Sequence, residues 1–304
     1  MKWKSIYLLF KDAGKQWLAN KAPRLGAALA FYTIFSLAPL LVIIMALAGL
    51  LFGREAVQHH ISDQVQSLVG GQGAEAINAM VASANKPRSG IVASVLGIIM
   101  LIFGAGGLFG QLQDALNTIW GVEPKPGRGI WGMLQERFLS FSMVLGSAFL
   151  LLVSLVVSTA LAALGGAFGD WQHGVIGQIV NTVVDLIVIT LLFAMIYKFL
   201  PDVKISWKDV WLGAFVTAVL FTIGKVLIGL YLGRSSISSS YGAAGSLAVL
   251  LIWLYYASQI FLFGAELTKA YGDHFGSRIV PADHAEPISA RAQAEQGLQP
   301  ARQR

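Results

Sequence analysis

The chain has 304 residues, of which 56% are apolar and only 12% are charged. Globular domains have about 25% charged residues, so this chain could not cover a surface exposed to water, and a soluble enzyme is excluded. The formal net charge is +6, but the basic residues gather in particular loops, and membrane topology explains them better than nucleic-acid binding does. Cysteine is absent, which excludes disulfides, thiolate zinc sites and a cysteine nucleophile.

Residues 1–29 predict an amphipathic helix that precedes the apolar part of the chain. Trp3, Tyr7, Phe10 and Trp17 recur at helical spacing, with lysines mostly between them. A basic polar side and an aromatic-rich apolar side are typical of a helix that lies in a membrane interface. The alternative interpretation is an ordinary helix packed on the rest of the protein.

Six apolar runs are each long enough to cross about 30 Å of hydrocarbon as a helix. Because backbone groups cannot stay unpaired in lipid, each run is expected to be helical. The sequence therefore predicts an all-α polytopic membrane protein with six transmembrane helices in a domain that covers residues 30–270. The runs are 30–52, 91–109, 138–164, 175–200, 210–232 and 243–269.

Lysine and arginine are distributed unevenly between the two sides that these spans define. The N-terminal segment, the second and fourth connections and the C-terminal segment together hold 17 of them, and the other connections hold four. Positive charge is retained on the cytoplasmic side of a membrane. Both termini are therefore predicted to face the cytoplasm.

Two polar segments flank or interrupt the spans. In the first connection, residues 53–90, apolar residues step by three or four, which predicts short amphipathic helices that either lie on the outer membrane surface or cap a cavity. Residues 271–304 are polar and contain three prolines, and this composition predicts a disordered cytoplasmic tail.

Two ionisable residues lie deep in predicted spans, where an unpaired charge is costly. Asp185 is near the middle of the fourth span and Lys225 is in the outer half of the fifth. Neighbouring antiparallel helices would place them near one another, which suggests a salt bridge that lines a polar cavity. A purely structural pair and an outward-snorkelling Lys225 are the alternatives.

A second polar group is predicted at the cytoplasmic side of the membrane. Gln111, Asp114 and Asn117 follow one another at steps of three, and Gln259 and Glu266 lie seven residues apart, so each set shares a helix face. Asp114, Gln259 and Glu266 could line a polar vestibule at the inner mouth of a cavity. The alternative is ordinary solvation of helix ends.

Pro39 interrupts the first span and predicts a kink, because proline removes one backbone hydrogen bond. The chain has no P-loop of the form GxxxxGK[ST], and its only adjacent histidine pair, His59 and His60, lacks the acidic partners of a hydrolytic metal site. No catalytic residue, metal site or cofactor is therefore predicted.

Four segments resemble the YihY/BrkB family of bacterial inner-membrane proteins. They are LGAALAFYTIFSLAPLLVI (25–43), QDALNTIW (113–120), YKFLPDVKISW (197–207) and YGAAGSLAVLLIWLYYASQIFLFGAEL (241–267). The resemblance implies six spans in the bacterial inner membrane with both ends inside. Members of the family have been labelled ribonuclease BN and have been linked to serum resistance and to export of lipid or lipopolysaccharide precursors, but the family provides no catalytic residues to transfer.

The leading functional hypothesis is a transporter or flippase-like protein that acts on a lipid or an amphipathic solute without ATP. Asp185 and Lys225 would be its deep charged contacts, and membrane lipids rather than nucleic acid would be its partners. The alternatives are a non-catalytic scaffold or assembly factor for the cell envelope and, least favoured, a membrane-bound ribonuclease. The sequence leaves the substrate, the coupling ion and the oligomeric state open.

Overall fold

The computed structural model describes five main stretches of the chain, residues 3–52, 107–125, 175–234, 243–276 and 279–295. It also describes some single helical residues within 62–82 and at position 146. These parts are mostly helical, as the sequence predicted, with four short strands in addition.

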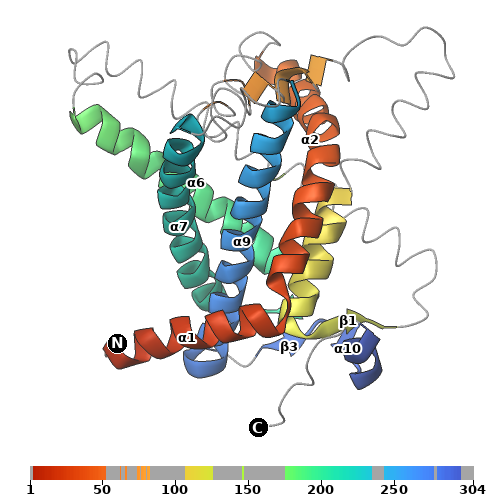
Figure 1. Ribbon diagram of the computed structural model, residues 1–304. Coiled ribbons are helices and arrows are strands. Elements are labelled where there is room, and N and C mark those ends of the chain that lie inside the picture. The colour runs from red at the N-terminus through yellow and green to blue at the C-terminus, as the bar shows by residue number, and fades with distance from the viewer. Residues whose placement is uncertain are drawn as a thin grey trace, which may run out of the picture.

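Four long helices and a shorter one form a bundle (Figure 1). The long helices are α2 (Ala22–Phe52), α6 (Val175–Phe199), α7 (Trp207–Arg234) and α9 (Ala243–Phe275), and residues 107–120 are also helical. α9 packs against both α2 and α7, while α6 packs against α7 and is strongly inclined to the other helices. α9 is therefore the central helix of the described part.

Three helices in the described part are long and apolar enough to cross a membrane. The stretches are Thr182–Phe199, Trp207–Ile228 and Leu247–Phe275, and Ala22–Leu37 is a shorter apolar helix. The predicted spans 91–109 and 138–164 lie mostly outside the described residues, so six spans remain a prediction.

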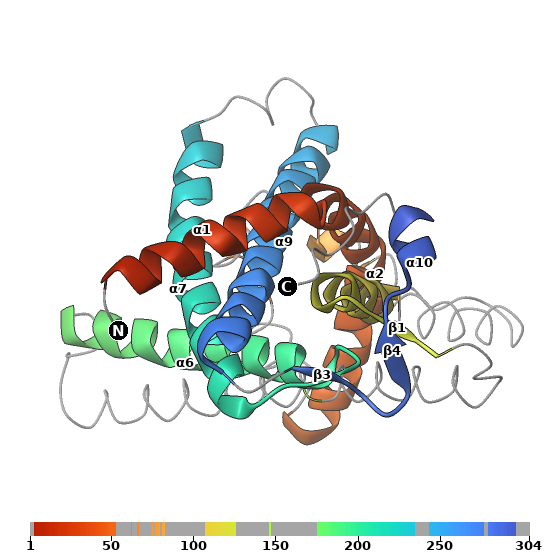
Figure 2. The same cartoon turned by 90° about the horizontal axis from the view of Figure 1, so that it is seen from below.

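One end of the bundle, which we call the strand end, gathers segments that are far apart in the sequence. The end of the 107–120 helix, the connection between α6 and α7 and the end of α9 meet there, and α1 (Trp3–Ala19) lies across them (Figures 1 and 2). The distribution of basic residues predicted these segments on one side, and the structure confirms that they share one end of the bundle.

The C-terminal segment pairs with two of these connections, and the prediction of a disordered tail is wrong for residues 279–295. β3 (Val280–Pro281) is antiparallel to β2 (Val203–Lys204), and β4 (Ala285–Pro287) is antiparallel to β1 (Val122–Pro124). α10 (Ala290–Glu295) follows. The polar, proline-containing composition suggested disorder. The strand pairing could not be predicted, because the partner strands are distant in the sequence. Residues 296–304 lie outside the described part.

α1 is a helix, as predicted, and it shows features of both interpretations offered for it. Leu9 and Ala13 are buried against Leu267 and Ala270 of α9. Other apolar side chains of α1 remain exposed, among them Leu18, which is 66% exposed. The helix therefore packs on the bundle and also presents an apolar surface outward.

The described residues test two predictions only in part, one about the first apolar span and one about the connection after it. α2 continues through Pro39, and the predicted kink stays a prediction. In the connection 53–90, the residues that the structure describes are helical, and Ala74 and Ile77 are buried among residues of α2 and α9. The rest of that connection lies outside the described residues.

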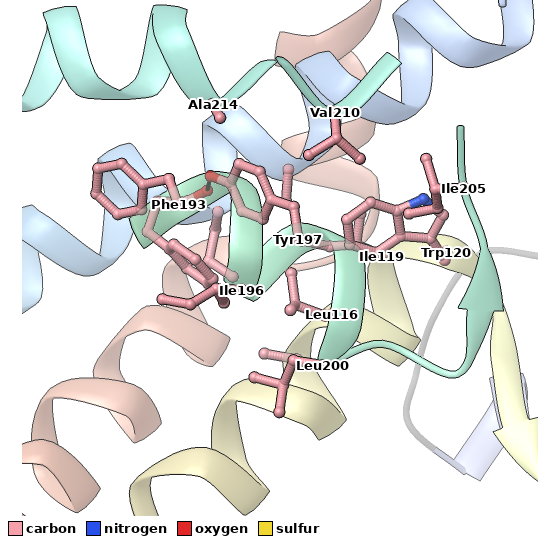
Figure 3. Packing of buried hydrophobic residues seen from close by; sticks show 14 of the residues in the cluster. Leu116, Ile119, Trp120, Phe193, Ile196, Tyr197, Leu200, Ile205, Val210 and Ala214 are labelled. Atoms are coloured by element: carbon pink, nitrogen blue, oxygen red, sulfur yellow. Dashed lines mark hydrogen bonds between the residues drawn. The ribbon is translucent and has the colours of Figure 1, made fainter. Parts of the chain in front are cut away.

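The core between α6, α7 and α9 is centred on Tyr197, which is fully buried (Figure 3). Its hydroxyl donates to the Phe261 carbonyl oxygen at 2.7 Å and lies 3.2 Å from Thr217 Oγ1. Gly264 permits this approach, because a Cβ atom there would collide with both Thr217 Oγ1 and the Tyr197 hydroxyl. Small residues allow such close helix contacts in membranes.

Candidate functional site

A buried polar network at the strand end is centred on Asp202, which lies three residues beyond the end of α6 and is 4% exposed. Its carboxylate accepts hydrogen bonds from Gln113 Nε2 at 3.1 Å and from Asn117 Nδ2 at 2.9 Å. The backbone N–H of Asp202 donates to Asn117 Oδ1 at 2.8 Å. The network therefore ties the 107–120 helix to the connection between α6 and α7.

The C-terminal segment completes this network from outside. His284 Nε2 lies 2.9 Å from Asp202 Oδ1. Next to it, the exposed Asp283 carboxylate accepts a hydrogen bond from Lys204 Nζ at 2.6 Å. This hydrogen bond and the lysine charge lower the pKa of Asp283 below its ordinary value. Lys125 Nζ donates to the Asp283 carbonyl oxygen at 2.8 Å, so the segment is held by β1 and β2 and also by side chains.

The sequence placed the polar face of the 107–120 helix correctly at Asn117 and incorrectly at Asp114. Asp114 was predicted to line a vestibule, but its side chain is exposed, while Gln113 and Asn117 are buried. These two residues lie four apart, which is a better helical repeat than the steps of three from Gln111. Sequence reasoning missed Asp202 altogether, although it lies in one of the four segments that carry the family resemblance.

A second polar group, which we call the elbow cluster, comprises the buried Glu266 and the partly buried Asn20 and Gln259. Lys21 has a φ of 52° and turns the chain between α1 and α2. This turn directs Asn20 Nδ2 onto Glu266 Oε1 at 2.7 Å. Gln259 lies against Gly26 of α2, where any Cβ atom would collide with its amide. Gln259 and Glu266 do lie on one face of α9, as predicted.

Several polar atoms of the elbow cluster are buried without a hydrogen-bond partner among the described residues. Glu266 is 0% exposed, and its Oε2 has no partner among the described protein groups. The same holds for both polar atoms of the Gln259 side chain. Nearly all buried polar groups in proteins are hydrogen-bonded. Buried polar atoms without a partner are therefore an unusual feature of this part of the bundle.

Asp185 and Lys225, the two deep charges predicted to pair, form no hydrogen bond or ion pair with one another in the described part of the chain. Both side chains are partly exposed. α6 is inclined to α7 (Figure 1), so residues far from their connection are carried apart. The predicted salt bridge is therefore wrong, because the prediction assumed parallel axes.

An apolar groove, which we call the lateral groove, runs between α6 and α7. It has a volume of about 660 Å³. Trp211 and Phe215 of α7 expose about half of their side-chain surface along it, 44% and 51%. Its lining residues are Val183, Leu186, Ile187, Thr190, Lys208, Trp211, Leu212, Phe215 and Tyr271. Sequence reasoning missed the groove, because it depends on how α6 and α7 cross.

The described residues contain no group of three or more His, Asp or Glu side chains placed to hold a metal ion. Asp202 and His284 are neighbours, but the other partners of Asp202 are the amides Gln113 and Asn117. The arrangement at the strand end is therefore that of a hydrogen-bond network between segments.

Comparison with known proteins identifies the relatives of the chain. Residues 13–289 match the model of the family described as virulence factor BrkB. The chain belongs to the virulence factor BrkB family. The matched region includes the three residues that contact the Asp202 carboxylate, Gln113, Asn117 and His284, and both members of the elbow cluster on α9.

Curated relatives of this family member are named UPF0761 membrane proteins. One from Ralstonia nicotianae is 28% identical over 82% of this chain and 55% of its own length, and one from Pseudomonas paraeruginosa is 26% identical over 83% and 60%. One from Actinobacillus pleuropneumoniae is 23% identical over 86% of this chain and 92% of its own. The chain thus spans less than two thirds of the first two relatives. No solved structure matches the chain. The protein is a membrane protein of the BrkB family.

Proposed function

We propose that this membrane protein moves a lipid or another amphipathic solute between the two sides of a bacterial inner membrane, without hydrolysing ATP. The lateral groove is the observation that carries the proposal. It lies between two helices that are each long and apolar enough to span a membrane. Lipid is the solvent around such helices, so an apolar groove on their outer side meets acyl chains directly.

The groove has the size and the chemistry for an amphipathic ligand. Its volume of about 660 Å³ falls within the range of small-molecule sites, roughly 300–1,000 Å³. Most of its lining is apolar, and Lys208 in the first turn of α7 gives its strand end a positive charge. Trp207, next to Lys208, and Trp211, one turn further along α7, are both exposed, as is typical of aromatic residues near the headgroup region. An acyl chain would occupy the groove and an anionic headgroup would lie near Lys208.

The topology predicted from the basic residues complements this proposal. We place the strand end in the cytoplasm, with both termini there, because most of the lysine and arginine lies on that side. Exposed apolar side chains and lysines on α1 then favour a position in the cytoplasmic membrane interface. We assign the protein no enzymatic activity and no cofactor.

The proposal is tested with purified protein in liposomes that contain fluorescent phospholipids of anionic or neutral headgroup. Thr190→Trp fills the groove, and Lys208→Gln removes its charge. We expect the first to slow translocation at least tenfold and the second to slow the anionic lipid more than the neutral one. Ile223→Trp is the matched control, because Ile223 is an exposed residue of α7 outside the groove lining. Equal rates in all four proteins at equal protein density would refute the proposal.

A scaffold for envelope assembly is the second candidate function. The observation in its favour is the outward surface of α1, where Tyr7 and Leu18 are each 66% exposed beside Lys11 and Lys15. A partner protein would cover this surface. Photo-crosslinkers at Tyr7 and Leu18 in intact cells distinguish the two candidates: capture of one protein together with absent lipid translocation would favour the scaffold, and capture of lipid would favour transport.

A further inference from the structure

Several buried polar side-chain atoms have no hydrogen-bond partner in the described part of the chain and do not line the lateral groove. Within the described residues, the buried side-chain atoms without a hydrogen-bond partner come from α1, the end of the 107–120 helix and α9. The acceptors are Gln16 Oε1, Gln259 Oε1 and Glu266 Oε2, and the donors are Gln259 Nε2, Trp17 Nε1 and Trp120 Nε1. Such atoms are costly to bury, so their presence needs an explanation.

Glu266 is the central member of this set, because it alone can carry a charge among the unpaired side chains. Its side chain is 0% exposed, and Asn20 donates to one carboxylate oxygen and leaves the other without a donor. An ionised carboxylate in an apolar interior is stabilised only when it is paired and hydrogen-bonded. One neutral amide donor falls short of that, so the surroundings favour the neutral form of the side chain.

The charged groups that act on Glu266 belong to its own helix. Lys269 attracts its negative charge and Asp273 repels it. The Lys269 ammonium is, however, engaged with the Ile119 carbonyl oxygen at 2.6 Å, at the end of the 107–120 helix. α1 and the elbow contribute the neutral Asn20 amide. Lys269 is thus directed toward another helix and leaves Glu266 Oε2 without a partner.

A proton on Oε2 would turn that oxygen into a donor. Gln16 Oε1, a buried acceptor without a partner, belongs to the last turn before Asn20, whose backbone N–H donates to the Gln16 carbonyl oxygen at 2.8 Å. A protonated Glu266 would then accept from Asn20 at one oxygen and present a donor at the other. Loss of the proton would remove the donor and leave a buried charge.

We propose that Glu266 is a reversible proton-binding site that fastens the turn between α1 and α2 to α9. Its proton is bound while the turn is seated on α9, and its release loosens that contact. The strand end of α9 also supplies Tyr271 to the lateral groove, five residues beyond Glu266. Proton release would therefore change the contacts of α9, which borders the groove. If the proposed transport function holds, the proton is the coupling ion of that transport.

Infrared difference spectroscopy tests proton binding without any transport assay. Protein in lipid nanodiscs is titrated from mildly acidic to alkaline pH, and the carbonyl band of a protonated carboxyl is followed. We expect wild type to lose one carboxyl band and to gain carboxylate bands, and Glu266→Gln to show neither change. Glu286→Gln, in the partly exposed β4 strand, is the control and should behave as wild type. Absence of the band in wild type, or its persistence in Glu266→Gln, would overturn the proposal.

A second variant keeps the test decisive if Glu266→Gln does not fold. Asn20→Ala removes the hydrogen bond that favours the ionised carboxylate, so the proton should be held to a higher pH than in wild type. An unshifted titration would contradict the assignment.

The coupling role needs one further measurement in the liposome assay. The rate of lipid translocation should depend on pH in wild type and lose that dependence in Glu266→Gln. A pH-independent rate in wild type would overturn coupling. If wild type moves no lipid at all, the proposed transport function fails, while the infrared result still decides whether Glu266 binds a proton.

Discussion

The strand end and the lateral groove differ in the kind of side chain that they contain and in what those side chains contact. At the strand end, polar side chains from distant segments bond to one another, as Asp202 does with Gln113, Asn117 and His284. Along the groove, large apolar side chains such as Phe215 stay exposed, because lipid covers them. The comparison suggests that the strand end fixes the relative positions of the helices and that the groove is free to accept a ligand.

The largest effect that the comparison predicts is at Asp202. Asp202→Ala leaves Gln113 and Asn117 buried without their acceptor, and unpaired buried groups cost about 1–3 kcal/mol each. We expect a loss of about 3 kcal/mol in the free energy of unfolding, measured by thermal or denaturant unfolding in detergent. Asp283→Asn, a neighbouring but exposed aspartate, is the control. A wild-type stability in Asp202→Ala would show that the network does not hold the strand end together.

The contact between α7 and α9 is expected to give the next largest effect. Gly264→Ala places a Cβ atom against Thr217 and Tyr197 in the core, and overpacking costs about 1–3 kcal/mol. Gly14→Ala is the matched control, since no atom lies within 4 Å of a Cβ at that position in α1. It should be neutral or more stable by about 0.5–1 kcal/mol, because alanine favours a helix over glycine. Equal melting temperatures for the two variants would contradict the packing described for Tyr197.

The smallest effect concerns the exposed pair of Asp283 and Lys204. The pair lowers the pKa of Asp283, so its contribution is present above the ordinary aspartate pKa of about 3.9 and is lost as the pH falls through the lower pKa of the folded state. We expect hydrogen exchange at β3 and β4 to quicken on acidification in wild type. The acceleration should be weaker in Asp283→Asn and also at high salt, which screens exposed charges. Identical pH profiles in the two proteins would assign the loosening to other groups.

The sequence revealed the helical membrane fold because its signal is local and long. Each apolar run has to span the hydrocarbon as a helix by itself, so α6, α7 and α9 could be located without knowledge of their neighbours. The shared face of Gln259 and Glu266 was predictable for the same reason, since it depends on the period of one helix.

The missed features all depend on contacts between distant segments. Strands β3 and β4 contain prolines and polar residues and were assigned to a disordered tail, since their partners lie at Val203 and Val122. Asp202 was missed because its partners Gln113 and Asn117 precede it by 89 and 85 residues. The pairing of Asp185 with Lys225 failed because the inclination of α6 is set by packing, which no helical period encodes.

The central claim, that the groove between α6 and α7 opens to lipid, can be tested by site-directed spin labelling. The chain has no native cysteine, so Ile187→Cys and Phe215→Cys label the groove alone, and Lys204→Cys labels the exposed strand end. Collision with lipid-soluble oxygen and with a water-soluble nickel complex is then compared in nanodiscs. We expect both groove labels to favour oxygen and the Lys204 label to favour nickel. Groove labels that favour nickel would contradict the account.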